Sequence, residues 1–317
     1  MASEFAIIEQ YFSDVGKAAE NTLLGVGDDA AVVDLPAGQQ LVVAMDTLIE
    51  GTHFPQNTSP ADIAYKSLAV NLSDLAAMGA KPAWFLMSLT LDNDDPQWLS
   101  RFAEGLKETS NEYGLQLIGG DTCRGKLAIS IQIAGHLPNG QFVTRQGANP
   151  GDIILVSGVL GNAALGLAQQ QGNLELTPAL RSHCVLALNR PRPRLELGPF
   201  LRQFASSAID ISDGLVGDLK HILKASACGA RISLESLPVN QWIEQHGAWE
   251  YALGAGDDYE ICCTLPAGLC GEVDNWNNAN PDCRLTPIGE ITESGYYLQD
   301  GDDMINLDQR QGYRHFA

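Results

Sequence analysis

The stretch "SPADIAYKSLAVNLSDLAAMGAKPAWFLMSLTL", residues 59–91, predicts a helix followed by a strand and marks the boundaries of the helix. Ser59 is the expected N-cap, Pro60 the first helical residue and Asp62 the capping-box partner. Gly79 marks the expected end of the helix. The apolar run that follows is typical of a buried strand. The residues expected on the core stripe of the helix are Ile63, Leu68, Leu72 and Leu75.

Segments on both sides of this pair continue the alternation of strands and helices. Before it, "LVVAMD" is a short apolar strand that ends in Asp46. After it, "WLSRFAEGLKETSNEYG" is expected to form a helix ending at Gly114. "LQLIGGD" then predicts a strand that runs into a glycine turn with Asp121 at its tip, and "LAISIQIAGH" alternates as a further strand. The first half is therefore expected to be α/β.

The loop "TRQGANPGD", residues 144–152, is rich in Gly, Asn and Pro and suggests a domain boundary. We expect an N-terminal domain of residues 1–147 and a C-terminal domain of residues 148–317. In the second half, "SSAIDISDGLVGDLKHILKASACGARISL" predicts strand, loop, helix and strand, with Ser212 or Asp213 as N-cap and Gly229 as C-cap. The fold class expected for the whole chain is α/β.

Charge and cysteine content narrow the range of functions. The 317 residues include 39 acidic and 19 basic side chains, a formal net charge of −20, which argues against nucleic acid or an anionic membrane as partner. Seven cysteines without a C-x-x-C pair are typical of reduced thiols. The beginning of the chain lacks a basic signal-like region, and no apolar run reaches the roughly 20 residues of a membrane span. We expect a cytoplasmic protein.

Two glycine motifs fit known nucleotide-binding patterns, but their contexts exclude them. "GVGDDA" matches G-x-G-x-x-A, yet β-prone residues follow it where a Rossmann fold needs a helix. "GDTCRGK" matches G-x-x-x-x-G-K, yet Leu127 and a strand follow where a P-loop needs Ser or Thr and a helix. Neither a Rossmann site nor a P-loop is predicted.

Aspartates recur beside glycine or serine, mostly near the ends of apolar segments. Each of them taken singly fits ordinary turn chemistry. Together they would repel one another unless a hard cation neutralised them, and Mg²⁺ prefers such carboxylate oxygens. Arg145 is a candidate phosphate clamp in a chain poor in cations. The carboxylates are Asp28, Asp29, Asp46, Asp74, Asp121, Asp210 and Asp213.

The order of several motifs resembles the thiamine-monophosphate kinase family of the aminoimidazole ribonucleotide synthetase-like superfamily. The motifs are "GVGDDAAVV", "MDTLIEGTHF", "DIAYKSLAVNLSDLAAMGAKP", "QLIGGDT", "AIDISDGL", "GDDYE" and the closing "GYRHF". The resemblance implies a two-domain α/β (α+β) fold. Its N-terminal mixed sheet would form a barrel across a homodimer and bind ATP and Mg²⁺. A C-terminal α/β domain would complete the active site.

The resemblance also implies a reaction and a set of site residues. The reaction is transfer of the γ-phosphoryl of ATP to thiamine monophosphate, the last step of thiamine diphosphate biosynthesis. Several Mg²⁺ ions would take part and no general base would be needed, with Asp46 and Asp121 assisting the transfer as metal ligands. The implied metal ligands are Asp29, Asp46, Asp74, Asp121, Asp210 and Asp213. The implied ATP contacts are Gly120, Asp121, Arg145 and Ser212, and the implied thiamine monophosphate contacts are His53, Asp257 and Tyr313.

This sequence departs from the family pattern in two places. Ala44 and Met45 precede Asp46 where relatives often carry Ser and Thr hydroxyls. "AGDDYE" stands for the family's "GGEDYE", so Asp257 is one methylene shorter than the usual glutamate. Two alternatives stay open: another ATP-dependent ligase or cyclase reaction of the same superfamily, and a non-catalytic protein that binds nucleotide and Mg²⁺.

Overall fold

The structure is a computed structural model that describes residues 4–17, 19, 21–27, 30–310 and 312. The chain forms two compact units. The N-terminal unit comprises Met1–Leu75 and Ala80–Gln141, and the C-terminal unit comprises Ala76–Gly79 and Phe142–Ala317. The expected division at residue 147, with the role given to each domain, stays a prediction. No helix in the described ranges combines the length and hydrophobicity that crossing a bilayer requires.

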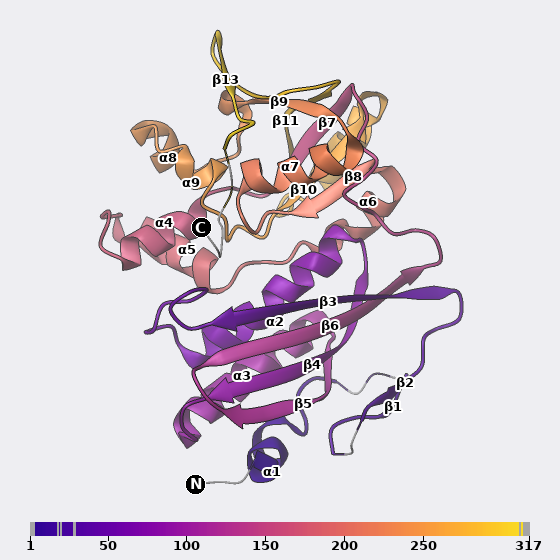
Figure 1. Ribbon diagram of the computed structural model, residues 1–317, viewed down its shortest axis with the longest axis vertical. Coiled ribbons are helices and arrows are strands. Elements are labelled where there is room, and N and C mark those ends of the chain that lie inside the picture. The colour runs from indigo at the N-terminus through magenta and orange to yellow at the C-terminus, as the bar shows by residue number, and fades with distance from the viewer. Residues whose placement is uncertain (1–3, 18, 20, 28–29, 311, 313–317) are drawn as a thin grey trace. The chain divides into compact units, whose positions relative to one another are not determined.

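A mixed sheet backed by two helices forms the N-terminal unit. The strand order is β3-β6-β4-β5, with β4 and β5 parallel and the other neighbours antiparallel. Figure 1 shows α2 and α3 together on one face of this sheet. The elements are α1 (Glu4–Ile7), η1 (Ile8–Phe12), β1 (Thr22–Leu24), β2 (Val32–Val33), β3 (Gln39–Ile49), α2 (Pro60–Ala77), β4 (Lys81–Leu91), α3 (Pro96–Tyr113), β5 (Gln116–Arg124) and β6 (Ala128–Pro138).

The start of helix α2 confirms the boundary signals read from the sequence. Ser59 Oγ accepts a hydrogen bond from Asp62 N at 3.1 Å, as expected of an N-cap. Gly79 follows the helix with φ of 72°, the left-handed conformation in which glycine is favoured. All four residues expected on the core stripe are buried. They fix the face that α2 presents to the sheet.

Two strand ends differ from the expectation. The glycine turn at Asp121 is wrong, because β5 continues through Asp121 to Arg124. Gly120 pairs with Met87 across the parallel β4–β5 ladder, and a Cβ atom there would lie 1.9 Å from the Met87 carbonyl oxygen. The glycine therefore permits close strand approach inside the ladder. Asp46 likewise lies within β3, which continues to Ile49.

The C-terminal unit contains a second mixed sheet, of seven strands in the order β13-β12-β9-β11-β7-β10-β8. Its strands are β7 (Asp152–Ser157), β8 (Ser207–Asp210), β9 (Gly229–Ser233), β10 (Ile261–Pro266), β11 (Leu285–Thr292), β12 (Tyr296–Asp300) and β13 (Asp303–Asn306). Its helices are α4 (Asn162–Gln170), α5 (Pro178–Asn189), η2 (Leu195–Leu197), α6 (Gly198–Phe204), α7 (Leu215–Ser226), η3 (Leu234–Ser236), α8 (Gln241–His246), α9 (Glu250–Leu253), η4 (Ala267–Leu269) and α10 (Cys270–Ala279).

Strand β7 lies inside this sheet and is buried on both faces. Ile154 and Val156 belong to one hydrophobic cluster, together with Leu219 of α7. Leu155, between them, belongs to another cluster, together with Leu201 of α6. Alternate side chains of a strand point to opposite faces, so the two clusters are the cores on the two sides of the sheet.

Both expected caps of helix α7 are wrong. The N-cap is Gly214, with φ of 104°, and neither Ser212 nor Asp213 caps the helix with its side chain. The C-cap is Ala227, in the left-handed conformation with φ of 53°, whereas Gly229 already belongs to β9. Asp218, a buried carboxylate within the helix, instead accepts the backbone N–H of Asp213 in the loop before the helix.

Candidate functional site

In the N-terminal unit, Asp46 is held by the helix behind the sheet. Its backbone N–H donates to Asn71 Oδ1 at 3.0 Å, and Asn71 Nδ2 donates to Ser67 O at 2.9 Å. Asn71 is fully buried, and burial raises the pKa of the Asp46 carboxyl. Asp74 follows Asn71 by three residues on α2, so the two lie on neighbouring positions of one helix face. A neutral amide thus fixes the strand that carries Asp46.

His53 lies in the turn after β3 and is also fixed locally. Its Nδ1 accepts the backbone N–H of Ile49 at 2.9 Å, which leaves Nε2 as the protonated nitrogen of the neutral ring. The buried Lys66 donates from Nζ to the His53 carbonyl at 3.2 Å. His53 is therefore oriented by its own turn and by α2.

Asp121 and Gly120 lie on β5, where Asp121 is exposed and pairs with Ser88 of β4. Within the described residues, no group of three or more His, Cys, Asp or Glu side chains is arranged to hold a metal ion. Asp28, Asp29 and Tyr313 lie outside the described residues. The metal-ligand set stays a prediction.

In the C-terminal unit, three carboxylates gather at the loop between β8 and α7. Asp210 ends β8 opposite Ile261, and Asp218 Oδ2 accepts the backbone N–H of Asp213 at 2.9 Å. The pKa of Asp218 is raised to about 8, by burial first and then by the charges of Asp210 and Asp213. Such mutual repulsion is what a bound cation would relieve, and carboxylate oxygens are the donors that Mg²⁺ prefers. The donor type fits Mg²⁺, but within the described residues these side chains are not arranged as a metal-binding group.

A second loop packs against this one and carries Asp257. The Asp257 N–H donates to Ser212 O at 2.8 Å, and the Tyr259 N–H donates to Ile211 O at 2.8 Å. Asp257 and Tyr259 both have positive φ, 65° and 51°. Non-glycine residues rarely adopt such angles, and such strain is most often found at functional sites. The structure thus brings Ser212, Asp213 and Asp257 together within one unit.

The loop that carries Arg145 is tied to the end of α7. Ser226 Oγ accepts the backbone N–H groups of Gly147 and Ala148 at 3.1 and 3.2 Å and donates to the Arg145 carbonyl at 3.3 Å. Arg145 itself is exposed. Its guanidinium can therefore reach a ligand in solution.

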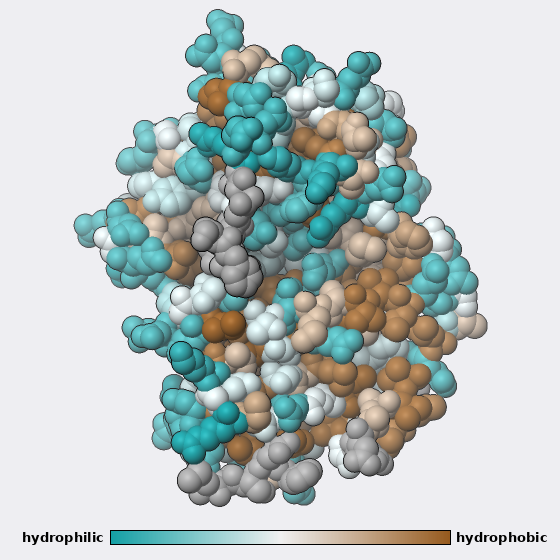
Figure 2. Space-filling view, viewed as in Figure 1, coloured by the Kyte–Doolittle hydropathy of each residue, from teal (hydrophilic) through white to brown (hydrophobic). Residues whose placement is uncertain are grey.

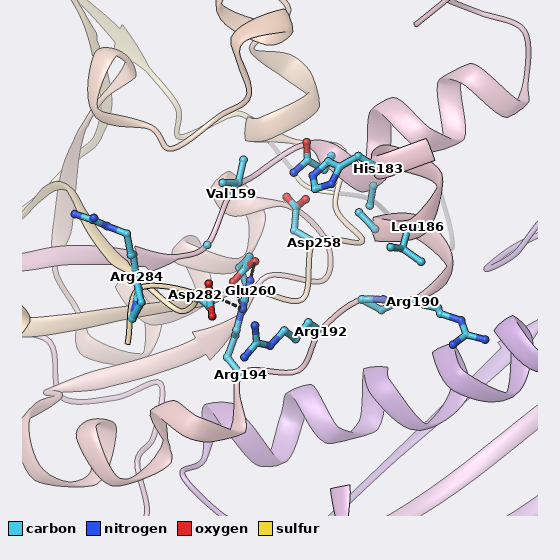
Figure 3. A pocket seen from close by; sticks show the side chains of 16 residues that line it. Val159, His183, Leu186, Arg190, Arg192, Arg194, Asp258, Glu260, Asp282 and Arg284 are labelled. Atoms are coloured by element: carbon cyan, nitrogen blue, oxygen red, sulfur yellow. Dashed lines mark hydrogen bonds and ion pairs between the residues drawn. The ribbon is translucent and has the colours of Figure 1, made fainter. Parts of the chain in front are cut away.

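Sequence reasoning missed two features of the C-terminal unit. One is Asp218, whose position in the first turn of α7 was the only sequence signal for its role in holding the loop. The other is a cavity of about 380 Å³ whose lining includes Asp258, His183 and Arg194, shown in Figure 3. Asp258 stands beside Asp257 in the sequence, but the walls of the cavity come from distant segments.

The comparisons with known proteins agree over nearly the whole chain. Residues 27–137 match AIR synthase related protein, N-terminal domain, and residues 149–300 match AIR synthase related protein, C-terminal domain. The chain is 44% identical to the thiamine-monophosphate kinase of Escherichia coli K12, over 99% of this chain and 98% of that protein.

Solved structures of related proteins share the fold. The crystal structure of thiamine-monophosphate kinase from Stenotrophomonas maltophilia K279a has a TM-score of 0.83 and 42% identity, and covers 88% of this chain and 92% of its own. A structure described as AaThiL complexed with AMPPCP and TMP has a TM-score of 0.76 and 30% identity, covering 92% of each chain. The two-domain fold implied by the resemblance is confirmed, and the chain belongs to the AIR synthase related family and, within it, to the thiamine-monophosphate kinases.

Proposed function

We propose that this protein is a kinase that transfers the γ-phosphoryl group of ATP to thiamine monophosphate, giving thiamine diphosphate and ADP. The observation that carries the proposal is the full-length relationship to proteins named for this activity, 44% identical for the Escherichia coli K12 protein. A relative with 30% identity has been solved with AMPPCP and TMP, an ATP analogue and the acceptor. The reaction would be the last step of thiamine diphosphate biosynthesis.

The proposal includes several Mg²⁺ ions, with the aspartates implied by the family resemblance as their ligands. Bound Mg²⁺ would supply positive charge that offsets the charge of the phosphate groups. Asn71 would keep Asp46 in place through the bond to its N–H, and Asp218 would do the same for Asp213. The proposed ligands are Asp29, Asp46, Asp74, Asp121, Asp210 and Asp213.

In this phosphoryl transfer the main task of the protein is to bind ATP and thiamine monophosphate and to align them. The acceptor is a phosphate oxygen that is already deprotonated at neutral pH, so a direct in-line transfer needs no general base. We assign Gly120, Arg145 and Ser212 to ATP. A guanidinium such as that of Arg145 can bind two phosphate oxygens at once. We assign His53, Asp257 and Tyr313 to thiamine monophosphate.

An exposed apolar face supports a homodimer as part of the proposal. Within the described residues β3 pairs with β6 on one side and is the edge of its sheet, while Leu41, Val43 and Met45 are exposed apolar side chains spaced two apart along it. Figure 2 shows apolar side chains gathered over the N-terminal unit. An apolar edge strand of this kind is normally covered. We propose that a second copy of the chain covers it, in a barrel formed across the dimer.

The proposed location is the cytoplasm. All seven cysteines are free thiols, as is usual in a reducing compartment.

The test is ADP release by the purified protein with ATP and Mg²⁺, in the presence and absence of thiamine monophosphate. ADP release that depends on thiamine monophosphate supports the kinase. Equal release in both samples would instead indicate another acceptor or another reaction of the superfamily. ATP binding without ADP release would indicate a non-catalytic protein, in which the changes at Ala44, Met45 and Asp257 have ended turnover.

A further inference from the structure

The loop of residues 254–260 joins α9 to β10 and carries Asp257, the residue assigned above to thiamine monophosphate. We call it the Asp257 loop. Two of its residues, Asp257 and Tyr259, have positive φ angles of 65° and 51°. Such angles are unfavourable for residues with a side chain, and they persist only where surrounding contacts hold the backbone. The contacts on either side of this strained stretch therefore determine where Asp257 lies.

The middle of the Asp257 loop is attached to two neighbouring loops. The N–H groups of Asp257 and Tyr259 each donate to a backbone carbonyl of the loop between β8 and α7, at 2.8 Å. Asp258 Oδ1 accepts the Gly161 N–H at 2.9 Å, whereas Oδ2 is buried without a hydrogen-bond partner among the described residues. These bonds join loop to loop, so they do not attach the stretch to a strand of the sheet.

The last residue of the loop, Glu260, is held through its side chain. Arg194 donates from Nε to Glu260 Oε2 at 2.7 Å and from Nη2 to Oε1 at 2.5 Å, the bonds drawn as dashed lines in Figure 3. Ser157, the last residue of β7, donates from Oγ to Oε2 at 2.5 Å and accepts the Ile261 N–H at 2.8 Å. Both carboxylate oxygens are therefore bound, and the end of the loop is anchored to β7.

The backbone beside Ser157 leaves room for this ion pair. A Cβ atom on Gly158 would lie 2.0 Å from Glu260 Oε1 and 2.6 Å from Arg194 Nη2. Gly158 also has a φ of 59°, a conformation that favours glycine. Any other residue at position 158 would therefore displace the two charged groups from each other.

The ion pair is better suited to fixing geometry than to stabilising the fold. The side chains of Arg194 and Glu260 are 10% and 7% exposed, so both charges are largely removed from water. The free energy of that removal largely cancels their attraction, and apolar residues of similar size often stabilise a fold equally well. A planar guanidinium and a carboxylate joined by two parallel bonds nevertheless have one relative orientation.

We propose that Arg194 and Glu260 are positioning residues that hold Asp257 where it binds thiamine monophosphate. The inference rests on the proposed function, which assigns Asp257 to that substrate. The Glu260 carbonyl accepts the Ile211 N–H at 2.7 Å, so a shift of Glu260 would move both the strained stretch and its contact with the loop between β8 and α7. Arg145, assigned to ATP, lies on a separate loop, so the loss should fall mainly on thiamine monophosphate.

The test removes the ion pair without leaving a buried charge unpaired. The double variant Arg194→Met/Glu260→Leu replaces both charged side chains by apolar ones. Its matched control is Arg231→Met/Glu290→Leu, the same changes in an ion pair of the same unit whose side chains are both 47% exposed. Arg194→Lys keeps the positive charge but lacks the planar pair of donors. Steady-state kinetics gives the KM for each substrate, and denaturant unfolding reports whether each variant is folded.

We expect the double variant to fold and its KM for thiamine monophosphate to rise roughly tenfold or more, because a small displacement of a binding group has a large effect. Its KM for ATP should stay close to that of wild type, and the control should match wild type for both substrates. Arg194→Lys should show the same selective rise at a smaller magnitude, and it decides the question if the double variant does not fold. An unchanged KM for thiamine monophosphate overturns the proposal. So does an equal rise in both KM values, which would show a general effect on the fold.

The proposed kinase reaction can fail independently of this inference. If the wild type binds thiamine monophosphate without phosphoryl transfer, calorimetry replaces the kinetics. Binding that is roughly tenfold weaker in the double variant then supports the positioning role without the kinase. If the wild type makes thiamine diphosphate and the folded double variant keeps the wild-type KM, the kinase stands and the positioning role is overturned.

Discussion

The two units hold their predicted carboxylates in different ways. In the N-terminal unit Asp46 lies inside a strand, and the neutral amide of Asn71 binds its backbone N–H. In the C-terminal unit Asp213 lies on a loop, and another carboxylate, Asp218, binds its backbone N–H. The first arrangement places a neutral amide beside Asp46, whereas the second places carboxylates near one another: the pKa of Asp218 is raised by burial first and then by the charges of Asp210 and Asp213. Mg²⁺ should therefore matter more for the order of the loop between β8 and α7 than for the strand that carries Asp46.

The largest expected effect comes from removing a proposed ligand itself. Asp46→Asn should lower kcat about 100-fold or more at limiting Mg²⁺, because one anionic ligand is lost while the backbone bond to Asn71 remains. Steady-state kinetics with a magnesium titration measures it. Asp92→Asn, on an exposed loop of the same unit, is the matched control and should leave kcat unchanged. Near-normal turnover of Asp46→Asn would remove Asp46 from the metal site.

Removing the side chains that hold the proposed ligands in place should have a smaller effect than removing a ligand. Asn71→Ala and Asp218→Ala should each raise the Mg²⁺ concentration needed for half-maximal velocity roughly 10- to 100-fold, because loss of supporting hydrogen bonds weakens metal binding. Asp218→Asn restores an acceptor for the Asp213 N–H without the charge and should recover part of the loss. The measurement is the Mg²⁺ concentration at half-maximal velocity. An unchanged Mg²⁺ requirement in both alanine variants would show that these bonds only support the fold.

The apolar face of β3 should control assembly with little effect on folding. Val43→Glu places a charge on a side chain that is 48% exposed and should weaken self-association at least tenfold, as charged residues on edge strands do. Met304→Glu, on the strand β13 of the other unit, is 49% exposed and serves as the control. Sedimentation equilibrium reports the mass of each. Equal behaviour of the two variants would mean that β3 is not the dimer face.

The smallest effect concerns two helix ends that use the same backbone conformation with different residues. Helix α3 ends on Gly114 with φ of 68°, and α7 ends on Ala227 with φ of 53°. Gly114→Ala should destabilise the protein by about 1 kcal/mol and Ala227→Gly should stabilise it by about as much, because only glycine avoids the strain. Denaturant unfolding measures both. Changes of the same sign in the two variants would contradict this account.

Local signals predicted the elements but not the contacts between distant segments. Ser59 and Gly114 were assigned from short motifs, because a cap depends on neighbouring residues. Gly120 resembled a turn residue, and its actual role depends on Met87, which lies far from it in the sequence. Asp218 was missed for a related reason, because it accepts the Asp213 N–H only once the loop before the helix has folded back over it.

Candidate site residues could be predicted from the sequence where they belong to a short motif. Asp46 and Asp210 were selected from the pattern of aspartates beside glycine or serine, and His53 and Asp257 from motif resemblance. Nothing local marked Asp258, because its incomplete hydrogen bonding arises from burial by α4, α5 and the strands around it. Burial of a polar atom is a property of the tertiary structure, so a single sequence does not reveal it.

Phosphorus NMR of the purified protein with ATP, Mg²⁺ and thiamine monophosphate distinguishes phosphoryl transfer from ATP hydrolysis, because it identifies the product as well as the loss of ATP. We expect thiamine diphosphate and ADP resonances to grow together in equal amounts, and both to fail to grow in Asp46→Asn and Asp213→Asn. ADP accompanied only by inorganic phosphate, with thiamine monophosphate unchanged, would contradict it.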